Sequence, residues 1–426
     1  TLRLLARSEL KEGLPQAATG HLRAAHQLAR ELELNDLKKE SGLDLARALA
    51  SQDEGEALDS LIQAAPSAPA RQAYLLEKAL ALHARNELAA RDLLESFLIK
   101  NPRHPRRAEA ALALAENCLY LAPPDPALAR SHLDALSPEN GSPEQLRVLL
   151  ARLALNEGEN AARHFLRDQA SHPQAALVLF KLAEMLQRRQ ETGEAHLAYE
   201  TLLDQYPDSP LAPPARLLSA RTALALGTAS SLERALQRFD ELAASPSPLA
   251  TSARLEKIRA LLDHQLPDEA LAHAREILAA TDQPSSLVRW QALALAAEAC
   301  SRPEHYESAR KYYEELLADP ELPLSWRNRV SFLLGRTLEQ LALQPLALDI
   351  YYGVINRENQ APEEGTEWHW YYRCAFDGAI PLLEKARSWR AAHAIATRLA
   401  EEDGPQAERA RQLAKKLSLE HLLWED

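Results

Sequence analysis

An alanine that opens a helical apolar pattern recurs along the whole chain at intervals of 33 to 45 residues. In nine of the eleven cases a large apolar residue stands four positions later, on the same face of the expected helix. The alanines are Ala18, Ala57, Ala90, Ala129, Ala162, Ala195, Ala235, Ala270, Ala309, Ala347 and Ala392. A period of this length predicts stacked helical repeats, in which each repeat buries its apolar face against its neighbours rather than in one central core.

The clearest repeat is residues 176–209, AALVLFKLAEMLQRRQETGEAHLAYETLLDQYPD. Its first helix carries the small Ala183 on the apolar face. Its second helix begins near Ala195, continues through Tyr199 and ends at Pro207. Small residues at facing positions allow two helices to pack about 8–10 Å apart.

This pattern resembles the tetratricopeptide repeat (TPR), a helix–turn–helix of about 34 residues that closes with a proline. Ala183 stands where the family most often has Gly. The resemblance implies an all-α fold, a right-handed α-solenoid of about eleven TPR-like helix pairs with a C-terminal capping helix. Residues 93–119 and 199–226 also resemble bacterial cell-envelope TPR proteins, in which a second helix ends in an NP or YP turn.

We expect residues 1–426 to form a single superhelical array. Its parts are N-terminal repeats over 1–173, central repeats over 174–358, an aromatic-rich last pair over 359–404 and a capping helix over 405–426. The helical pattern starts almost directly at Thr1, so we expect further repeats before it. The final amphipathic helix has a polar outer face, so we expect the native C-terminus at Asp426.

Composition excludes several classes of function. The formal net charge of −12 argues against a nucleic-acid partner, because a phosphate backbone requires a positive surface. No apolar run approaches the roughly 18 residues of a transmembrane helix. The three cysteines, Cys118, Cys300 and Cys374, are far apart and odd in number, so a disulfide framework is not expected, and this weakly favours a reducing compartment.

No catalytic motif is found. The chain has no G-x-S-x-G sequence, no Gly-rich phosphate loop and no H-E-x-x-H helix. The stretch Glu304-His305-Tyr306-Glu307 has the spacing of an ordinary first turn of a second helix. We therefore predict that the protein is not an enzyme and has no catalytic residue, metal site or cofactor.

Binding is the remaining class of function, and TPR proteins hold a peptide or helix on the surface lined by their first helices. By resemblance, the positions that face this groove are Phe180, Glu184, Gln187, Arg259, Glu298, Phe332 and Arg336. The alternative is that these residues form ordinary solvated surface. The Lys and Asn clamp that some family members use for a terminal carboxylate is not present at these positions.

Aromatic residues concentrate towards the C-terminus. Of 23 aromatic residues, 15 lie in residues 290–426. Aromatic side chains both supply binding energy at interfaces and fill the cores of solenoids, so either role is open for them. The stretch Trp368, Trp370, Tyr371 and Tyr372 has two interpretations: internal packing around a bend at Pro381, or a patch that docks a partner. Pro381 lies within an apolar helical run, and a proline there costs about 3 kcal/mol unless something local offsets it.

The sequence thus predicts a non-catalytic scaffold that binds a peptide, helix or protein surface in its concave groove, and bacterial envelope assembly is the setting that the family resemblance suggests. Two alternatives remain: a solenoid that assembles with its own copies, or the regulatory arm of a larger enzyme. The expected partner is a protein or peptide, not nucleic acid, and homo-oligomers are compatible with the sequence. The resemblance favours the periplasm or envelope, with the cytoplasm as the alternative.

Overall fold

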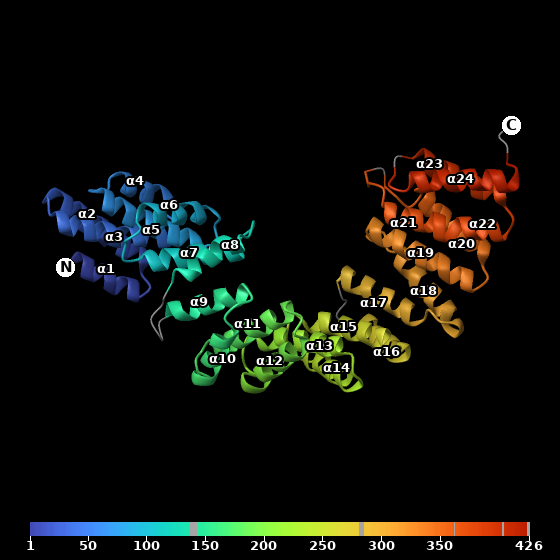
Figure 1. Ribbon diagram of the computed structural model, residues 1–426, viewed down its shortest axis with the longest axis horizontal. Helices are drawn as coiled ribbons and strands as arrows, with labels where there is room; N and C mark the ends of the chain where they lie inside the picture. The colour runs from blue at the N-terminus through green and yellow to red at the C-terminus, as the bar shows by residue number, and fades with distance from the viewer. Residues whose placement is uncertain (137–142, 281–284, 362, 403, 424–426) are drawn as a thin grey trace. The chain divides into compact units, whose positions relative to one another are not determined.

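The computed structural model describes residues 1–136, 143–280, 285–361, 363–402 and 404–423. All regular secondary structure in these ranges is helical, which confirms the predicted all-α class (Figure 1). The chain divides into two compact units, unit 1 over Thr1–Leu211 and unit 2 over Ala212–Asp426. The expectation of one continuous array across both units stays a prediction.

Unit 1 consists of antiparallel helix pairs in which consecutive pairs pack side by side. The pairs within its described residues are α1 (Leu2–Lys11) with α2 (Pro15–Glu31), α3 (Asn35–Ser51) with α4 (Gly55–Gln63), α5 (Ala68–Ala84) with α6 (Ala89–Lys100), α7 (Arg107–Tyr120) with α8 (Pro126–Asp134), α9 (Pro143–Ala154) with α10 (Glu159–Asp168), and α11 (Ala175–Arg188) with α12 (Thr192–Gln205).

Unit 2 continues the same arrangement and then departs from it at its last pair. Its regular pairs are α13 (Ala212–Leu226) with α14 (Ala229–Ala243), α15 (Ala250–Asp263) with α16 (Pro267–Leu278), α17 (Ser286–Ala299) with η1 and α18 (Pro303–His305, Tyr306–Leu317), and α19 (Leu324–Gln340) with α20 (Gln344–Ile355). The last pair joins α21 (Trp368–Tyr372), the π-helical η2 (Arg373–Ala379) and α22 (Ile380–Lys385) to α23 (Trp389–Glu401), and α24 (Ala407–His421) follows. Over the described residues this makes eleven pairs and one final helix, as predicted.

The recurring alanines explain why the pairs pack closely. Ten of the eleven have no exposed surface, so each marks a point where the second helix meets its partner. Ala57 is the exception, because α4 buries the neighbouring Leu58 instead and leaves Ala57 half-buried. Leu61, four positions after Ala57, is buried as the predicted register requires, so only the partial exposure of Ala57 departs from the pattern.

Most turns within pairs share one backbone conformation. A residue with positive φ follows the first helix in nine of the eleven pairs over the described residues. In eight of these pairs the next residue donates its N–H to the carbonyl five positions earlier, at 2.8–3.0 Å, as in Glu191 to Leu186. This closure satisfies carbonyls that the helix end leaves free. The turn residues are Gly13, Asp53, Asn86, Asn156, Gln190, Gly227, Gln265, Ala342 and Arg387.

The helix that contains Pro381 changes from π-helical to α-helical hydrogen bonding just before the proline, and so avoids the free-energy cost expected of a proline in a helix interior. The π-helical segment η2 ends at Ala379, and Pro381 then falls in the first turn of α22. A proline in a first turn lacks an N–H that would have no partner there in any case. The predicted local compensation is therefore a π segment immediately before the proline.

The final helix α24 closes unit 2 with a polar outer surface. Ala410, Ala414 and Leu417 are buried against α23. The outward residues Glu408, Arg409, Arg411, Lys415 and Lys416 are exposed, as predicted. Residues 424–426, the end of the predicted cap, lie outside the described residues. Among the described residues no helix is both long and apolar enough to cross a membrane.

Candidate binding site

A pocket of about 230 Å³ opens on the first helices of unit 2. The half-buried Trp326 contributes to its wall, with its ring centroid 6.4 Å from that of the buried Trp290. The guanidinium groups of Arg259 on α15 and Arg329 on α19 line the same pocket. Its other lining residues are Leu262, Asp263, Gln291, Ala294, Leu295 and Glu298.

Both arginines of this pocket are available to a ligand. Arg259 and Arg329 are exposed, and neither forms an ion pair with a carboxylate in the part of the chain that the structure describes. The guanidinium carbon of Arg329 lies 5.8 Å from the centroid of the Trp326 ring, within cation–π distance. Asp263 and Glu298 add carboxylates, so the pocket presents both signs of charge beside an aromatic ring.

A second aromatic cluster adjoins this pocket on α19. Phe332 is three residues from Arg329 and therefore its neighbour on the helix surface. The ring centroids of Phe332 and Trp370 are 5.8 Å apart, and the Arg373 guanidinium carbon lies 4.5 Å and 5.7 Å from them, respectively. Arg373 also donates to Asp377 through Nε at 3.1 Å.

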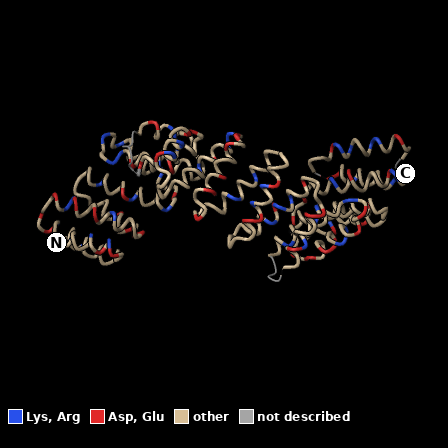
Figure 2. The backbone as a smooth tube through the Cα atoms, turned by 90° about the horizontal axis from the view of Figure 1, so that it is seen from below, with Lys and Arg blue, Asp and Glu red and all other residues tan. Residues whose placement is uncertain are grey.

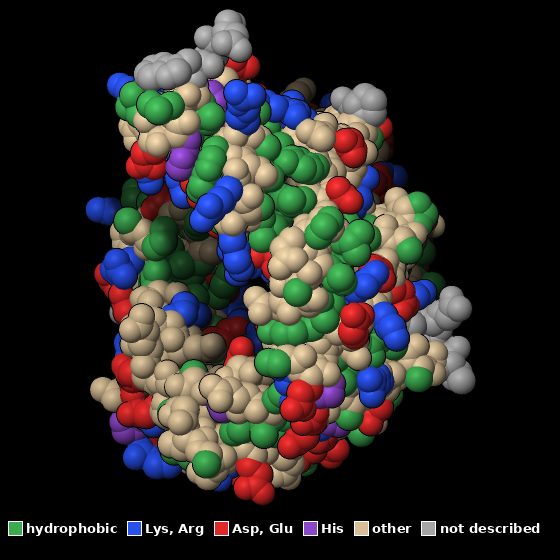
Figure 3. Space-filling view, turned by 90° about the vertical axis from the view of Figure 1, so that its right-hand side faces the viewer, with side chains coloured by type: hydrophobic (Ala, Val, Ile, Leu, Met, Phe, Trp, Pro, Cys, Tyr) green, Lys and Arg blue, Asp and Glu red, His purple; other side chains and the backbone are tan. Residues whose placement is uncertain are grey.

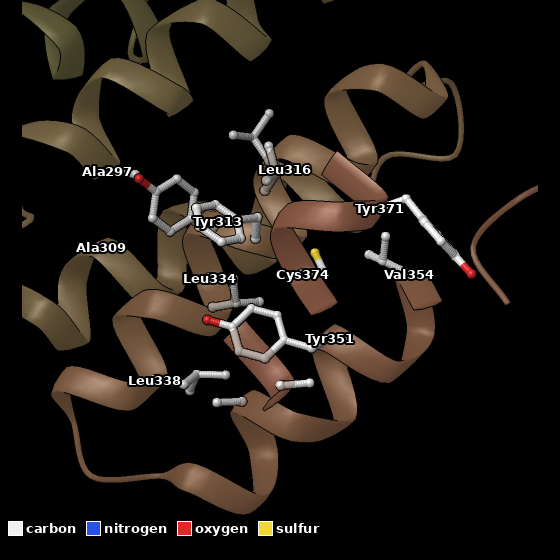
Figure 4. Close-up of a cluster of buried hydrophobic side chains, with 14 of the residues drawn as sticks. Ala297, Ala309, Tyr313, Leu316, Leu334, Leu338, Tyr351, Val354, Tyr371 and Cys374 are labelled. Carbon is white, nitrogen blue, oxygen red and sulfur yellow. The ribbon is translucent and has the colours of Figure 1, made fainter. Parts of the chain in front are cut away.

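Tyr351 supports this region from beneath. Its ring packs so closely against two helices that a Cβ at Gly335 would lie 2.3 Å from it and a Cβ at Gly378 would lie 2.7 Å from it. Figure 4 shows the ring near Leu334 and Leu338, inside the apolar cluster of unit 2. The hydroxyl donates to Glu339 Oε1 at 2.5 Å, and burial, reinforced by this carboxylate, raises the pKa of Tyr351.

The predicted aromatic stretch on α21 packs mainly inside the protein. Tyr371 and Tyr372 are buried, and Trp368 stacks on Tyr372 with their ring centroids 5.6 Å apart. Arg357 lies over the rings of Trp368 and Tyr371, at 5.9 and 5.4 Å. Arg357 and the Tyr371 hydroxyl both donate to Glu402 Oε2, at 2.9 and 2.8 Å. Within this stretch, Trp368 and Trp370 keep partly exposed surfaces.

The three residues predicted on α11 belong to unit 1 and form their own group. Phe180 is buried edge-on against Tyr199, with ring centroids 5.8 Å apart. The Tyr199 hydroxyl donates to Gln187 Oε1 at 3.2 Å, and Glu184 pairs with Lys181 at 2.8 Å. All three side chains thus have partners within unit 1. Of the three, Gln187 is exposed and Glu184 is half-buried, so these two contribute to the surface of α11.

The structure therefore brings together only some of the predicted residues. Arg259 lines the pocket, Phe332 and Trp370 form the adjoining cluster, and Arg336 lies exposed beside Glu339 at 3.3 Å. Glu298, also predicted, lines the same pocket as Arg259. The binding role of all eleven predicted residues stays a prediction, and four of them, Phe180, Phe332, Tyr371 and Tyr372, are buried. Sequence reasoning did not select Arg329 or Arg373. The three-residue spacing of Trp326 and Arg329 on one helix was the signal that could have identified the first of these.

Charges of both signs are distributed along the chain. Figure 2 shows Lys and Arg alternating with Asp and Glu along the helices, and Figure 3 shows apolar side chains interrupted by charged ones on the surface it displays. The first helices of unit 2, from α13 to α22, carry eleven Lys or Arg against six Asp or Glu. They are thus net positive in a chain whose formal charge is −12.

The titratable groups of the described residues include candidate metal ligands and nucleophiles. No group of three or more His, Cys, Asp or Glu side chains there could hold a metal ion. Cys118, Cys300 and Cys374 are buried, and burial raises the pKa of the Cys374 thiol to about 12. A thiol with so high a pKa is a poor nucleophile near neutral pH.

No protein-family model and no curated protein matches the chain. The repeated helix pairs, their buried alanines and their shared turn decide the fold. Each unit is a stack of TPR-like helix pairs. The sequence resemblance to TPR proteins is thus confirmed at the level of the fold, while the resemblance to envelope proteins stays a prediction.

The solved structures similar to the chain include several helical repeat proteins. A tetratricopeptide repeat protein from Parabacteroides merdae ATCC 43184 is 14% identical, covers 65% of this chain and 96% of its own, and has a TM-score of 0.39. The APC/C hetero-tetramer Cut9–Hcn1 is 12% identical, covers 98% of this chain and 89% of its own, and has a TM-score of 0.34. The TPR domain of P58(IPK) is 15% identical, covers 99% of this chain and 98% of its own, and has a TM-score of 0.25. These TM-scores are too low to add to the argument from the helix pairs themselves.

Proposed function

We propose that the protein is a non-catalytic scaffold that binds a segment of another polypeptide on the first helices of unit 2. The observation that carries this proposal is the pocket where Arg259 and Arg329, without acidic partners among the described residues, stand beside the half-buried Trp326. Arginine and tryptophan are the residue types most enriched at binding hot spots. A peptide is the ligand that suits such a site, because it supplies both an apolar side chain and charged groups.

The surrounding residues explain how the site is held in shape. Phe332 and Trp370 pack between α19 and α21, and Tyr351 packs tightly under both α19 and η2. A site built on helices whose side chains are fixed from below loses little entropy on binding. The proposed ligand therefore meets a prepared surface rather than a loop that must be ordered.

Selection from a library of random peptides on the immobilised protein tests the proposal. Peptides enriched on the wild type should bind Arg259→Ala/Arg329→Ala at least about tenfold more weakly, because charge-assisted hydrogen bonds are lost. Arg390→Ala is the matched control, since Arg390 is exposed on the second helix α23 and has no recorded ion pair among the described residues. No enrichment, or equal affinities for wild type and double variant, would contradict the proposal.

The proposed setting is the assembly of a bacterial cell envelope. It is supported by the resemblance of residues 93–119 and 199–226 to envelope TPR proteins. Fractionation of the native cell tests this part separately. Recovery with the envelope supports it, and recovery only with cytoplasmic proteins contradicts it without affecting the binding proposal.

A further inference from the structure

A second pocket of unit 2, of about 400 Å³, lies on its second helices, and we call it the second-helix groove. Residues of α18 and α20 line its sides, and α19, which packs against both, provides its floor. The volume falls within the range of about 300–1,000 Å³ that is typical of ligand pockets. The groove shares no lining residue with the proposed peptide site. Its large apolar lining residues are Leu317, Leu334, Leu338, Leu346 and Ile350.

The apolar lining runs from the buried floor to the exposed rim. Leu334 and Leu338 on α19 are buried, Ile350 on α20 is half-buried, and Leu346 on α20 is 43% exposed. Each helix thus contributes two apolar side chains that are four residues, or about one helical turn, apart. Apolar side chains of an amphipathic helix recur at the same spacing, and such helices bind by placing their apolar face in a groove.

The charged groups of the groove leave it net negative. Glu314 on α18 and Asp349 on α20 line it, and both are exposed. Arg310 also lines it, but this guanidinium donates to Glu314 at 2.7 Å and lies 3.9 Å from Glu307. Asp349 forms no ion pair within the part of the chain that the structure describes. Its carboxylate is therefore available to a cationic group of a ligand.

The helices on this side of unit 2 share the negative charge. The second helices α14, α16, α18, α20 and α23 carry seven Lys or Arg against eleven Asp or Glu. The balance is the reverse of that on the first helices, which line the proposed peptide site. A negative surface disfavours the phosphates of nucleic acids and anionic lipids and favours a basic ligand.

We infer that the second-helix groove binds a basic amphipathic helix of another protein. The apolar side chains of that helix contact the leucines of the groove, and its Lys or Arg residues lie against Asp349 and Glu314. The long stems of Lys and Arg also cover apolar surface, so they suit a rim such as that at Leu346. This surface is additional to the proposed peptide site and does not depend on it.

Selection from a library of amphipathic helical peptides tests the inference. The peptides have leucine fixed at positions four residues apart and random residues beside them. The immobilised protein is the full chain with Arg259→Ala/Arg329→Ala, so that the arginines of the proposed peptide site do not contribute. Enriched peptides should carry more Lys and Arg than Asp and Glu beside the leucines. In the same background, Leu346→Glu should weaken their binding at least about tenfold and Asp349→Lys about fivefold.

Both substituted positions are exposed, so circular dichroism and melting temperature should not change. The matched controls are Leu197→Glu and Asp204→Lys, which make the same changes at exposed positions of α12, a second helix of unit 1. They should bind the enriched peptides as the unsubstituted background does. Loss of peptide binding on Arg259→Ala/Arg329→Ala alone concerns the proposed function and is measured separately.

Three results would overturn the inference. The first is enrichment without an excess of basic residues, or no enrichment at all. The second is equal affinity of the peptides for Leu346→Glu and for Leu197→Glu. The third is a wild-type dimer in light scattering that Leu346→Glu dissociates, because the ligand of the groove would then be a second copy of this chain.

Discussion

The first helices of the two units are joined by different interactions. In unit 1 they are joined by ion pairs: Arg47 donates to Glu77 at 2.8 Å, and Glu116 accepts from His83 at 3.1 Å and from Arg147 at 2.9 Å. In unit 2, Arg221 of α13 also pairs with Glu256 of α15, but the later first helices are joined by tilted pairs of aromatic rings, Trp290 with Trp326 and Phe332 with Trp370. The same backbone arrangement therefore accepts two kinds of lateral contact.

This difference has a consequence for binding. In unit 1 several arginines of the first helices pair with a carboxylate on a neighbouring first helix, as Arg47 does with Glu77 and Arg147 with Glu116. In unit 2, Arg259 and Arg329 keep no such partner among the described residues. A guanidinium that holds no carboxylate within the protein is free to bind one from a ligand. The comparison thus favours unit 2 as the binding unit.

The largest expected effect concerns the tight contact of Tyr351 in unit 2. Gly335→Ala places a methyl group 2.3 Å from the ring, so we expect a loss of about 3 kcal/mol in the free energy of unfolding. All six tryptophans lie in unit 2, so urea unfolding followed by tryptophan fluorescence reports on this unit alone.

Gly353→Ala is the matched control for that substitution. Gly353 lies in α20 of the same unit, and nothing is within 4 Å of a Cβ added there. We expect it to leave the unit unchanged or to stabilise it by up to about 1 kcal/mol through helix propensity. Equal effects of the two substitutions would show that the aromatic contact does not limit the stability of unit 2.

A smaller effect is expected from the hydroxyl of Tyr351. Tyr351→Phe keeps the ring and removes the hydrogen bond to Glu339, so we expect a loss of about 1.5 kcal/mol. The same fluorescence titration measures it. Because Glu339 also pairs with Arg336, Tyr351→Phe in an Arg336→Ala background should cost more than in the wild type. Strict additivity would show that the three groups are not coupled.

The smallest effect is expected from acid and concerns unit 1. Burial raises the pKa of Glu116, but hydrogen bonds from His83 and Arg147 outweigh it and hold the pKa below its ordinary value. Because the folded-state pKa is the lower one, the stabilisation is complete above the unfolded pKa of about 4.3 and is lost as pH falls through the folded value.

We expect this loss to be about 1 kcal/mol, since Arg147 is partly exposed and solvent weakens the pair. Circular dichroism detects both units whereas tryptophan fluorescence detects unit 2, so their difference isolates unit 1. Glu116→Gln should remove this part of the acid dependence, and Glu401→Gln, at an exposed position of α23, should not. An unchanged acid profile in Glu116→Gln would contradict the assignment.

The helix pairs could be predicted because each depends on contacts close in sequence. A buried alanine and a turn residue with positive φ recur locally, and only Ala57, in the short helix α4, is half-buried rather than buried. The π segment before Pro381 could not be predicted, because Gly378 within it packs against Tyr351, a residue of another helix that is distant in sequence. The pocket was predicted only in part: Arg259 and Glu298 were expected at the groove, whereas Arg329 was not, because it joins them only through the packing of α15, α17 and α19.

The central claim is that neighbouring helix pairs, not one common core, supply the burial that keeps this chain folded. Hydrogen exchange of Gly335→Ala, followed by mass spectrometry along the chain, tests it most directly. The account predicts lost protection in α19, α20, η2 and α22, where the packing around Tyr351 is disturbed, with α1–α12 as protected as in the wild type. Equal loss of protection in every helix of both units would show a single cooperative core and contradict the account.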